Sequence, residues 1–194
     1  MNKYVQIHRR RREGVTDYRA RKKAILSRKT LLVVRISGKN VSAQFVRPQV
    51  GGDLVLASAH SRGLRKLKWG GSLKSVPSCY LLGLLAGKKA REKGVTEAIL
   101  YNGVSTFVRG SRVAAFAKGV RDAGVRVPMS EEAFPKEETL QGQAIATYAA
   151  ALLKDSKESY QRRFSALLRA GFKPEEYPRE FEKTKLAILG AGKR

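Results

Sequence analysis

The chain has 194 residues and carries 40 Lys and Arg against 16 Asp and Glu, which gives a formal net charge of +24. Hydrophobic residues make up 42% of it, enough for a folded core, so the composition excludes a wholly disordered basic protein. No apolar run approaches the roughly 18 residues of a membrane span, and no apolar segment follows the N-terminal charges, so we expect neither a membrane partner nor a secretory signal.

Residues 1–29 form the most basic segment, with eleven Lys or Arg and two acids. Like charges at this density repel one another unless a polyanion neutralises them, and a nucleic acid does so while it releases condensed counterions. We therefore interpret residues 1–29 as an RNA-binding arm that becomes ordered only on RNA. A solvated tail, a targeting signal and a membrane-surface patch are the alternatives.

Within the arm, Thr16 as N-cap and Asp17 at the positive end of the dipole predict a short helix from Tyr18 to about Ser27. Tyr18 is also a candidate for stacking on a base. The predicted RNA contacts of the arm are Arg9, Arg10, Arg11, Arg12, Tyr18, Arg19, Arg21, Lys22, Lys23, Arg28 and Lys29.

Residues 30–129 predict an α/β body. Three strands, at 31–37, 41–46 and 54–59, are joined by short turns and indicate an antiparallel meander. A helix at 77–93, a strand at 98–101, a helix at 111–123 and a short strand at 125–127 follow, with Ser75 placed to cap the first helix. This alternation places the later strands parallel, so we predict a mixed sheet of about five strands with helices packed on it.

Residues 130–194 form a third segment, which begins in an acidic linker at 128–135. Apolar stripes between 145 and 153 and between 160 and 168 predict two amphipathic helices, and a last helix runs from about 179 to 189. Its twelve basic and ten acidic residues nearly balance, so we expect this helical extension to dock on the body or on a neighbour.

Catalytic and metal sites gain little support. The best candidate for a catalytic nucleophile and base is the set Asp53, Ser58 and His60. These residues come from one hairpin, so their side chains are not expected to meet at one site. One cysteine, Cys79, excludes an internal disulfide and is more typical of a small buried apolar residue than of a nucleophile. We predict no cofactor, no metal ion and no small-molecule substrate.

One glycine-containing stretch resembles a phosphate-binding loop only superficially. Residues 83–89 lack the Ser or Thr that should follow the Lys, and they fall inside a helical pattern rather than between a strand and a helix. We interpret Gly83 and Gly87 instead as positions that let a helix approach the sheet closely.

Two loops carry further candidate RNA contacts. The segment 102–112 joins the end of a strand to the start of a helix, where free backbone N–H groups favour anions; the alternative is a polar turn with Ser111 as helix cap. The segment 61–71 is basic and punctuated by glycine, and its tryptophan is a candidate either for base stacking or for the core. The predicted contacts in these loops are Arg62, Arg65, Lys66, Lys68, Trp69, Ser105, Thr106, Arg109, Ser111 and Arg112.

Five collinear segments give the chain a resemblance to a known family. Residues 10–21, 59–62, 82–90, 110–113 and 121–128 resemble the archaeal and eukaryotic form of the large-subunit ribosomal protein that binds 5S rRNA, number eighteen in the bacterial naming. The resemblance covers most of residues 9–130 in the expected order. It implies a three-layer α/β body of ribonuclease-H-like topology, with a basic N-terminal arm and a helical C-terminal extension.

The resemblance also implies function and location. The chain is expected in the central protuberance of the large ribosomal subunit in the cytoplasm, where it holds 5S rRNA against the large, 23S-type rRNA beside neighbouring ribosomal proteins. We divide it into residues 1–29 as RNA-binding arm, 30–129 as 5S rRNA-binding body and 130–194 as helical extension. A general RNA-binding chaperone is the alternative, and a ribonuclease-H-like nuclease is disfavoured because residues 30–129 contain only Asp53, Glu92, Glu97 and Asp122 as acids.

Overall fold

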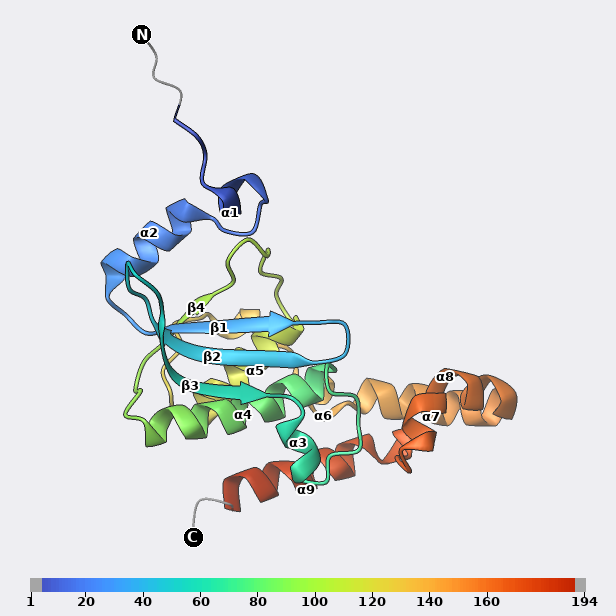
Figure 1. The fold of residues 1–194 in the computed structure, drawn as a ribbon. Helices are drawn as coiled ribbons and strands as arrows, with labels where there is room; N and C mark the ends of the chain where they lie inside the picture. Colours follow the sequence, from blue (N-terminus) through green and yellow to red (C-terminus); the bar gives the residue numbers. More distant parts are fainter. Residues whose placement is uncertain (1–4, 191–194) are drawn as a thin grey trace.

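The computed structural model describes residues 5–190, and it contains a mixed α/β body from which a helical extension projects (Figure 1). Four strands form one sheet in the order β3-β2-β1-β4. The strands are β1 (Leu31–Ile36), β2 (Val41–Arg47), β3 (Leu54–His60) and β4 (Ile99–Tyr101). The helices are α1 (Arg9–Arg12), α2 (Tyr18–Ser27), α3 (Gly63–Lys66), α4 (Val76–Glu92), α5 (Arg112–Asp122), α6 (Glu137–Gln141), α7 (Gln143–Asp155), α8 (Lys157–Arg169) and α9 (Tyr177–Gly190), with 3-10 turns η1 (Glu131–Ala133) and η2 (Pro174–Glu176).

The sheet confirms the predicted meander and corrects the number of strands. β1 and β2 are antiparallel, as are β2 and β3, whereas β4 runs parallel to β1 with Leu31 opposite Ile99. The fifth strand expected at residues 125–127 is wrong. Only a single parallel bridge forms there, between Glu97 and Arg126, and Pro128, which has no N–H, is unable to extend the pairing.

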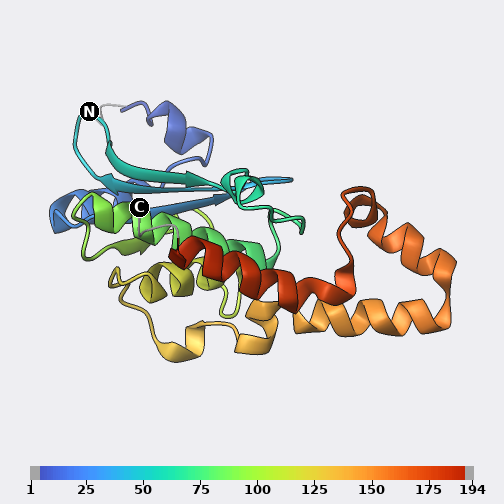
Figure 2. The ribbon, with the colours of Figure 1, turned by 90° about the horizontal axis from the view of Figure 1, so that it is seen from below.

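Helices α4 and α5 cover one face of the sheet and enclose the main core (Figure 2). Ser75 caps α4 as predicted, since its Oγ accepts a hydrogen bond of 3.4 Å from the Ser78 N–H. The close approach made possible by Gly83 is to a helix, not to the sheet as we expected. A Cβ at Gly83 would lie 3.1 Å from the Cα of Gly119 in α5, so the two glycines bring α4 and α5 together.

Helix α2 covers one end of the opposite face, which gives the body its third layer (Figure 1). Its Ala24 is buried against Leu31 and Val46 of the sheet. The residue that caps it is Asp17 rather than Thr16, because the Asp17 carboxylate accepts hydrogen bonds of 2.8 and 3.1 Å from the first backbone N–H groups of the helix. The short helix α1, a single turn of four arginines, was not predicted.

The C-terminal extension is attached to the body by its short first helix, α6, and by its last helix, α9. α7 and α8 form a hairpin that projects away from the sheet, whereas α9 returns and packs beside α4 (Figure 2). Phe172, Tyr177 and Phe181 bury their rings in the main core, and the Tyr177 hydroxyl lies 3.0 Å from Ser75 Oγ. The expected docking of the extension on the body therefore occurs through α6 and α9, and most of the α7–α8 hairpin lies outside the core.

Candidate nucleic-acid interface

An ion pair fixes the basic arm to the body. The guanidinium of Arg21, in α2, donates hydrogen bonds of 2.8 and 2.5 Å to the two carboxylate oxygens of Asp53 and one of 3.1 Å to the Gln49 carbonyl. These bonds lower the pKa of the Asp53 carboxyl, although partial burial opposes them. Together with the buried Ala24, the pair seats α2 on the loop between β2 and β3.

The fixed seat of α2 bears on two predictions about the arm. Arg21 is engaged with Asp53 within the chain, so it anchors α2 and is not a free cation in this structure. Within the arm, Tyr18–Ser27 docks on the body, and the ordering of residues 1–29 on RNA stays a prediction. Seven predicted cations of the arm are exposed and form no ion pair within residues 5–190: Arg10, Arg11, Arg12, Arg19, Lys22, Lys23 and Arg28.

Two other predicted cations of the arm carry an ion pair at the surface. Arg9 lies 3.6 Å from Glu13, and Lys29 lies 3.4 Å from Glu97. Such exposed pairs are weak and exchange readily with phosphate, so both residues stay candidates for RNA contact.

A hollow of about 510 Å³ opens between the arm and the exposed face of the sheet. The Tyr18 ring lies on the arm side of it, and Val33, Arg35 and Tyr101 line it from β1 and β4. Sequence reasoning missed Arg35 and Tyr101. The signal for Arg35 was present, because strand alternation places it on the face opposite the buried Val34, where a charge can only point to solvent or to a partner.

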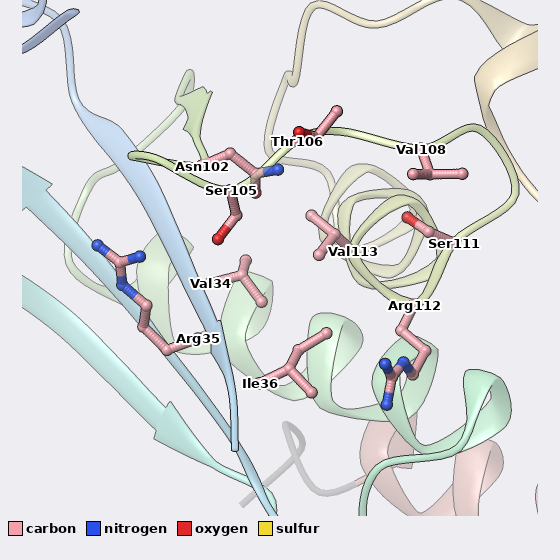
Figure 3. Close-up of a pocket in the computed structure, with 10 residues that line it drawn as sticks. All are labelled: Val34, Arg35, Ile36, Asn102, Ser105, Thr106, Val108, Ser111, Arg112 and Val113. Carbon is pink, nitrogen blue, oxygen red and sulfur yellow. The ribbon is translucent and has the colours of Figure 1, made fainter. Parts of the chain in front are cut away.

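The predicted contacts of the loop between β4 and α5 do not all lie together. Ser105, Thr106, Ser111 and Arg112 line one pocket, which Figure 3 shows with the side chains around it. Arg109 does not line this pocket and lies 3.6 Å from Glu132 at the surface. Ser111 is the helix cap, since its Oγ accepts a 3.4 Å hydrogen bond from the Ala114 N–H, and its hydroxyl proton is still able to donate to a ligand.

The basic segment after β3 forms the single helical turn α3, at the end of the sheet away from α2 (Figure 1). Its cations Arg62, Arg65, Lys66 and Lys68 are exposed as predicted. Base stacking by Trp69 is wrong, because the side chain is only 3% exposed. Its ring packs 6.0 Å from Phe172 and 5.5 Å from Tyr177, two residues that precede or begin α9.

The side chains that the sequence offered for chemistry are engaged or buried in the fold. Residues 5–190 contain no group of three or more His, Cys, Asp or Glu side chains that could hold a metal ion. Asp53 is bound to Arg21, and the His60 Nδ1 accepts a 3.1 Å hydrogen bond from the Arg62 N–H. Cys79 is buried, and burial raises the pKa of its thiol to about 12. In this described part of the chain no helix is long and apolar enough to cross a membrane.

Comparison with known proteins finds ribosomal proteins, which agrees with the basic surface of the chain. Residues 2–94 match the family described as ribosomal large subunit proteins 60S L5 and 50S L18. The large ribosomal subunit protein uL18 of Thermofilum pendens is 43% identical over 179 residues, which cover 92% of this chain and 91% of the relative. The uL18 protein of Aeropyrum pernix is 46% identical over 186 residues, which cover 95% of this chain and 87% of the relative. The chain therefore belongs to the uL18 family of large-subunit ribosomal proteins, and it is a structural component of the cytoplasmic ribosome rather than an enzyme.

Proposed function

We propose that this chain binds 5S rRNA and attaches it to the large-subunit rRNA in the central protuberance. The observation that carries the proposal is the fixed seat of α2, which holds the cations of the arm beside the open face of the sheet. The resemblance of residues 10–21 and four further segments to 5S rRNA-binding ribosomal proteins supports the choice of RNA.

The rigid anchorage of the arm favours one folded RNA over any phosphate chain. A flexible basic tail follows whatever anion it meets, whereas cations at fixed positions match only an RNA whose phosphates are arranged in the same way. The ion pair of Arg21 with Asp53 fixes α2, and Arg35 and Tyr101 add a polar sheet surface beneath it. This combination supplies affinity from phosphates and selectivity from shape.

Two separate basic patches support a bridging role. The arm lies over one end of the sheet, and the cations of α3 lie at the other end (Figure 1). We assign the arm patch, defined as α1 and α2, to 5S rRNA and the α3 patch, defined as Arg62, Arg65, Lys66 and Lys68, to the large rRNA. One body that presents cations at both ends is able to hold two RNA segments at once.

The helical extension supports contacts with neighbouring ribosomal proteins. Residues 143–153, which make up most of α7, contain no charged side chain, and Tyr148 and Leu153 on this helix are 48% and 43% exposed. An uncharged helix face offers no cation to phosphates, and its apolar side chains suit a protein surface. We therefore propose that the α7 side of the hairpin faces protein rather than RNA.

Competition binding tests the function. Labelled 5S rRNA should stay bound to the chain in the presence of excess tRNA, because the fixed cations select its fold. Release of 5S rRNA by tRNA in proportion to concentration would favour the general RNA chaperone, and strand-annealing activity would support that alternative. A variant with Ala at Arg62, Arg65, Lys66 and Lys68 should retain 5S rRNA and lose affinity for the large rRNA; loss of 5S rRNA instead would contradict the assignment of the two patches.

A further inference from the structure

The pocket at the end of β1 and β4 lies where the chain turns in two directions. β1 and β4 are parallel neighbours, and the chain leaves β1 toward β2 on one side. After β4 it passes through α5 and pairs Arg126 with Glu97, on the side of β4 away from β1. Connections that diverge in this way open a crevice at the carboxyl ends of parallel strands, which is where open α/β sheets bind their ligands.

The walls of this crevice combine an apolar floor with a polar rim. Val34 and Ile36 of β1 and Val113 of α5 form the floor, and Asn102 and Ser105 stand above it on the loop (Figure 3). The crevice has a volume of about 390 Å³, inside the range of roughly 300–1,000 Å³ that small ligands occupy. An apolar floor beside amide and hydroxyl groups suits a nucleobase, which has apolar faces and a hydrogen-bonding edge.

One charge beside the crevice matches a phosphate of a nucleotide. Arg112 lies beside the floor at the start of α5 (Figure 3), is exposed, and forms no ion pair with a carboxylate of residues 5–190. The Arg35 side chain points to the opposite face of the sheet, into the hollow beneath the arm. No carboxylate lines the crevice. A guanidinium binds phosphate oxygens in pairs of hydrogen bonds, so Arg112 is able to hold one phosphate of a chain that passes over the opening.

We propose that this crevice receives one unstacked nucleotide of the bound RNA, with the base against Val34, Ile36 and Val113 and a flanking phosphate on Arg112. The proposal rests on the proposed function for the identity of the RNA, since 5S rRNA is the expected source of the nucleotide. It goes further in assigning the crevice to a single unpaired residue rather than to a duplex, whose bases are stacked and do not enter a pocket of this kind.

Base-by-base chemical probing tests the proposal. In the complex with 5S rRNA, one nucleotide that reacts at its base edge in free RNA should become protected while the backbone protection extends over a longer segment. Ser105→Trp fills the crevice from an exposed loop position, so it should restore the reactivity of that one base and weaken binding about tenfold. Val104→Trp is the matched control, because Val104 is the 54% exposed neighbour and does not line the crevice.

Two results would overturn the assignment. One is a complex in which no single base is protected beyond the backbone footprint. The other is a Ser105→Trp protein with the same base protection and affinity as the parent. If the chain prefers the large rRNA to 5S rRNA, the proposed function fails. The same probing on the large rRNA, with the same two variants, then shows whether the crevice still receives a single base.

Discussion

Gly83→Ala should destabilise the protein because α4 and α5 approach through backbone atoms. The added Cβ would lie closer than 3.0 Å to the Phe116 carbonyl oxygen and 3.1 Å from the Cα of Gly119, and neither atom is able to rotate away. Overpacking a core costs about 1–3 kcal/mol, and a backbone obstacle belongs at the upper end of that range. Alanine stabilises a helix by about 1 kcal/mol relative to glycine, so we expect the free energy of unfolding to fall by about 2 kcal/mol in total.

Urea unfolding followed by circular dichroism measures this loss, which should also lower the melting temperature by about 4–8 °C for a chain of this length. Gly38→Ala is the control, because Gly38 has an ordinary φ angle and nothing within 4 Å of an added Cβ. The double variant Gly83→Ala with Gly119→Ala should lose less than the sum of the two single losses, because the first substitution already separates the helices. A Gly83→Ala protein as stable as the parent, or more stable, would refute the close packing of α4 on α5.

Three further predictions concern the anchor, the cysteine and the loop. Asp53→Asn should release α2 and lower the free energy of unfolding by about 1 kcal/mol at pH 7, and limited proteolysis should then cut the arm faster. The Arg21 hydrogen bonds hold the pKa of Asp53 below its unfolded value of about 3.9. The parent should therefore lose the stability that this ion pair gives only as the pH falls below about 4. Cys79 should resist alkylation in the native protein at pH 8, because burial raises the pKa of its thiol to about 12, and stoichiometric labelling without unfolding would contradict its place in the core. Arg112→Ala should weaken 5S rRNA binding by about tenfold and more than Arg109→Ala does, because only Arg112 lines the crevice; equal effects in a filter-binding assay would argue against that distinction.

Local signals in the sequence were sufficient for most elements of the body. Ser75 and Ser111 each stand before a helical pattern, and both act as caps through their hydroxyl groups. The alternation in residues 31–46 predicted a hairpin, which pairs Ile36 with Val41. Each of these features depends on neighbours within a few residues, so the local pattern determines it.

Features that depend on residues far apart in the chain could not be predicted from the sequence. Trp69 is buried because Phe172 and Tyr177 pack on it, and nothing near residue 69 reveals partners about a hundred positions away. Thr16 and Asp17 are both good N-cap residues. In the structure Asp17 caps α2, and the Thr16 hydroxyl instead accepts a 2.8 Å hydrogen bond from the Arg10 side chain. Gly83 was recognised as a site of close approach, but its partner helix could not be identified from spacing alone.

The sequence predicted which charged residues belong to the candidate interface, and the structure showed how they are arranged in space. Composition identified the arm and the loops, because the density of Lys and Arg is visible in the sequence. The roles of individual residues needed the structure, since only the fold pairs Arg21 with Asp53, separates Arg109 from the crevice and places Arg35 in the hollow beneath the arm. The division of the chain at residues 29/30 and 129/130 stays a prediction.

Ultraviolet crosslinking of the chain within assembled large subunits, followed by sequencing of the attached RNA, tests the central claim most directly. We expect crosslinks from the arm patch and from the crevice to 5S rRNA, and crosslinks from the α3 patch to the large rRNA. Crosslinks from all three regions to the large rRNA alone, with none to 5S rRNA, would contradict the claim that this chain holds the two RNAs together.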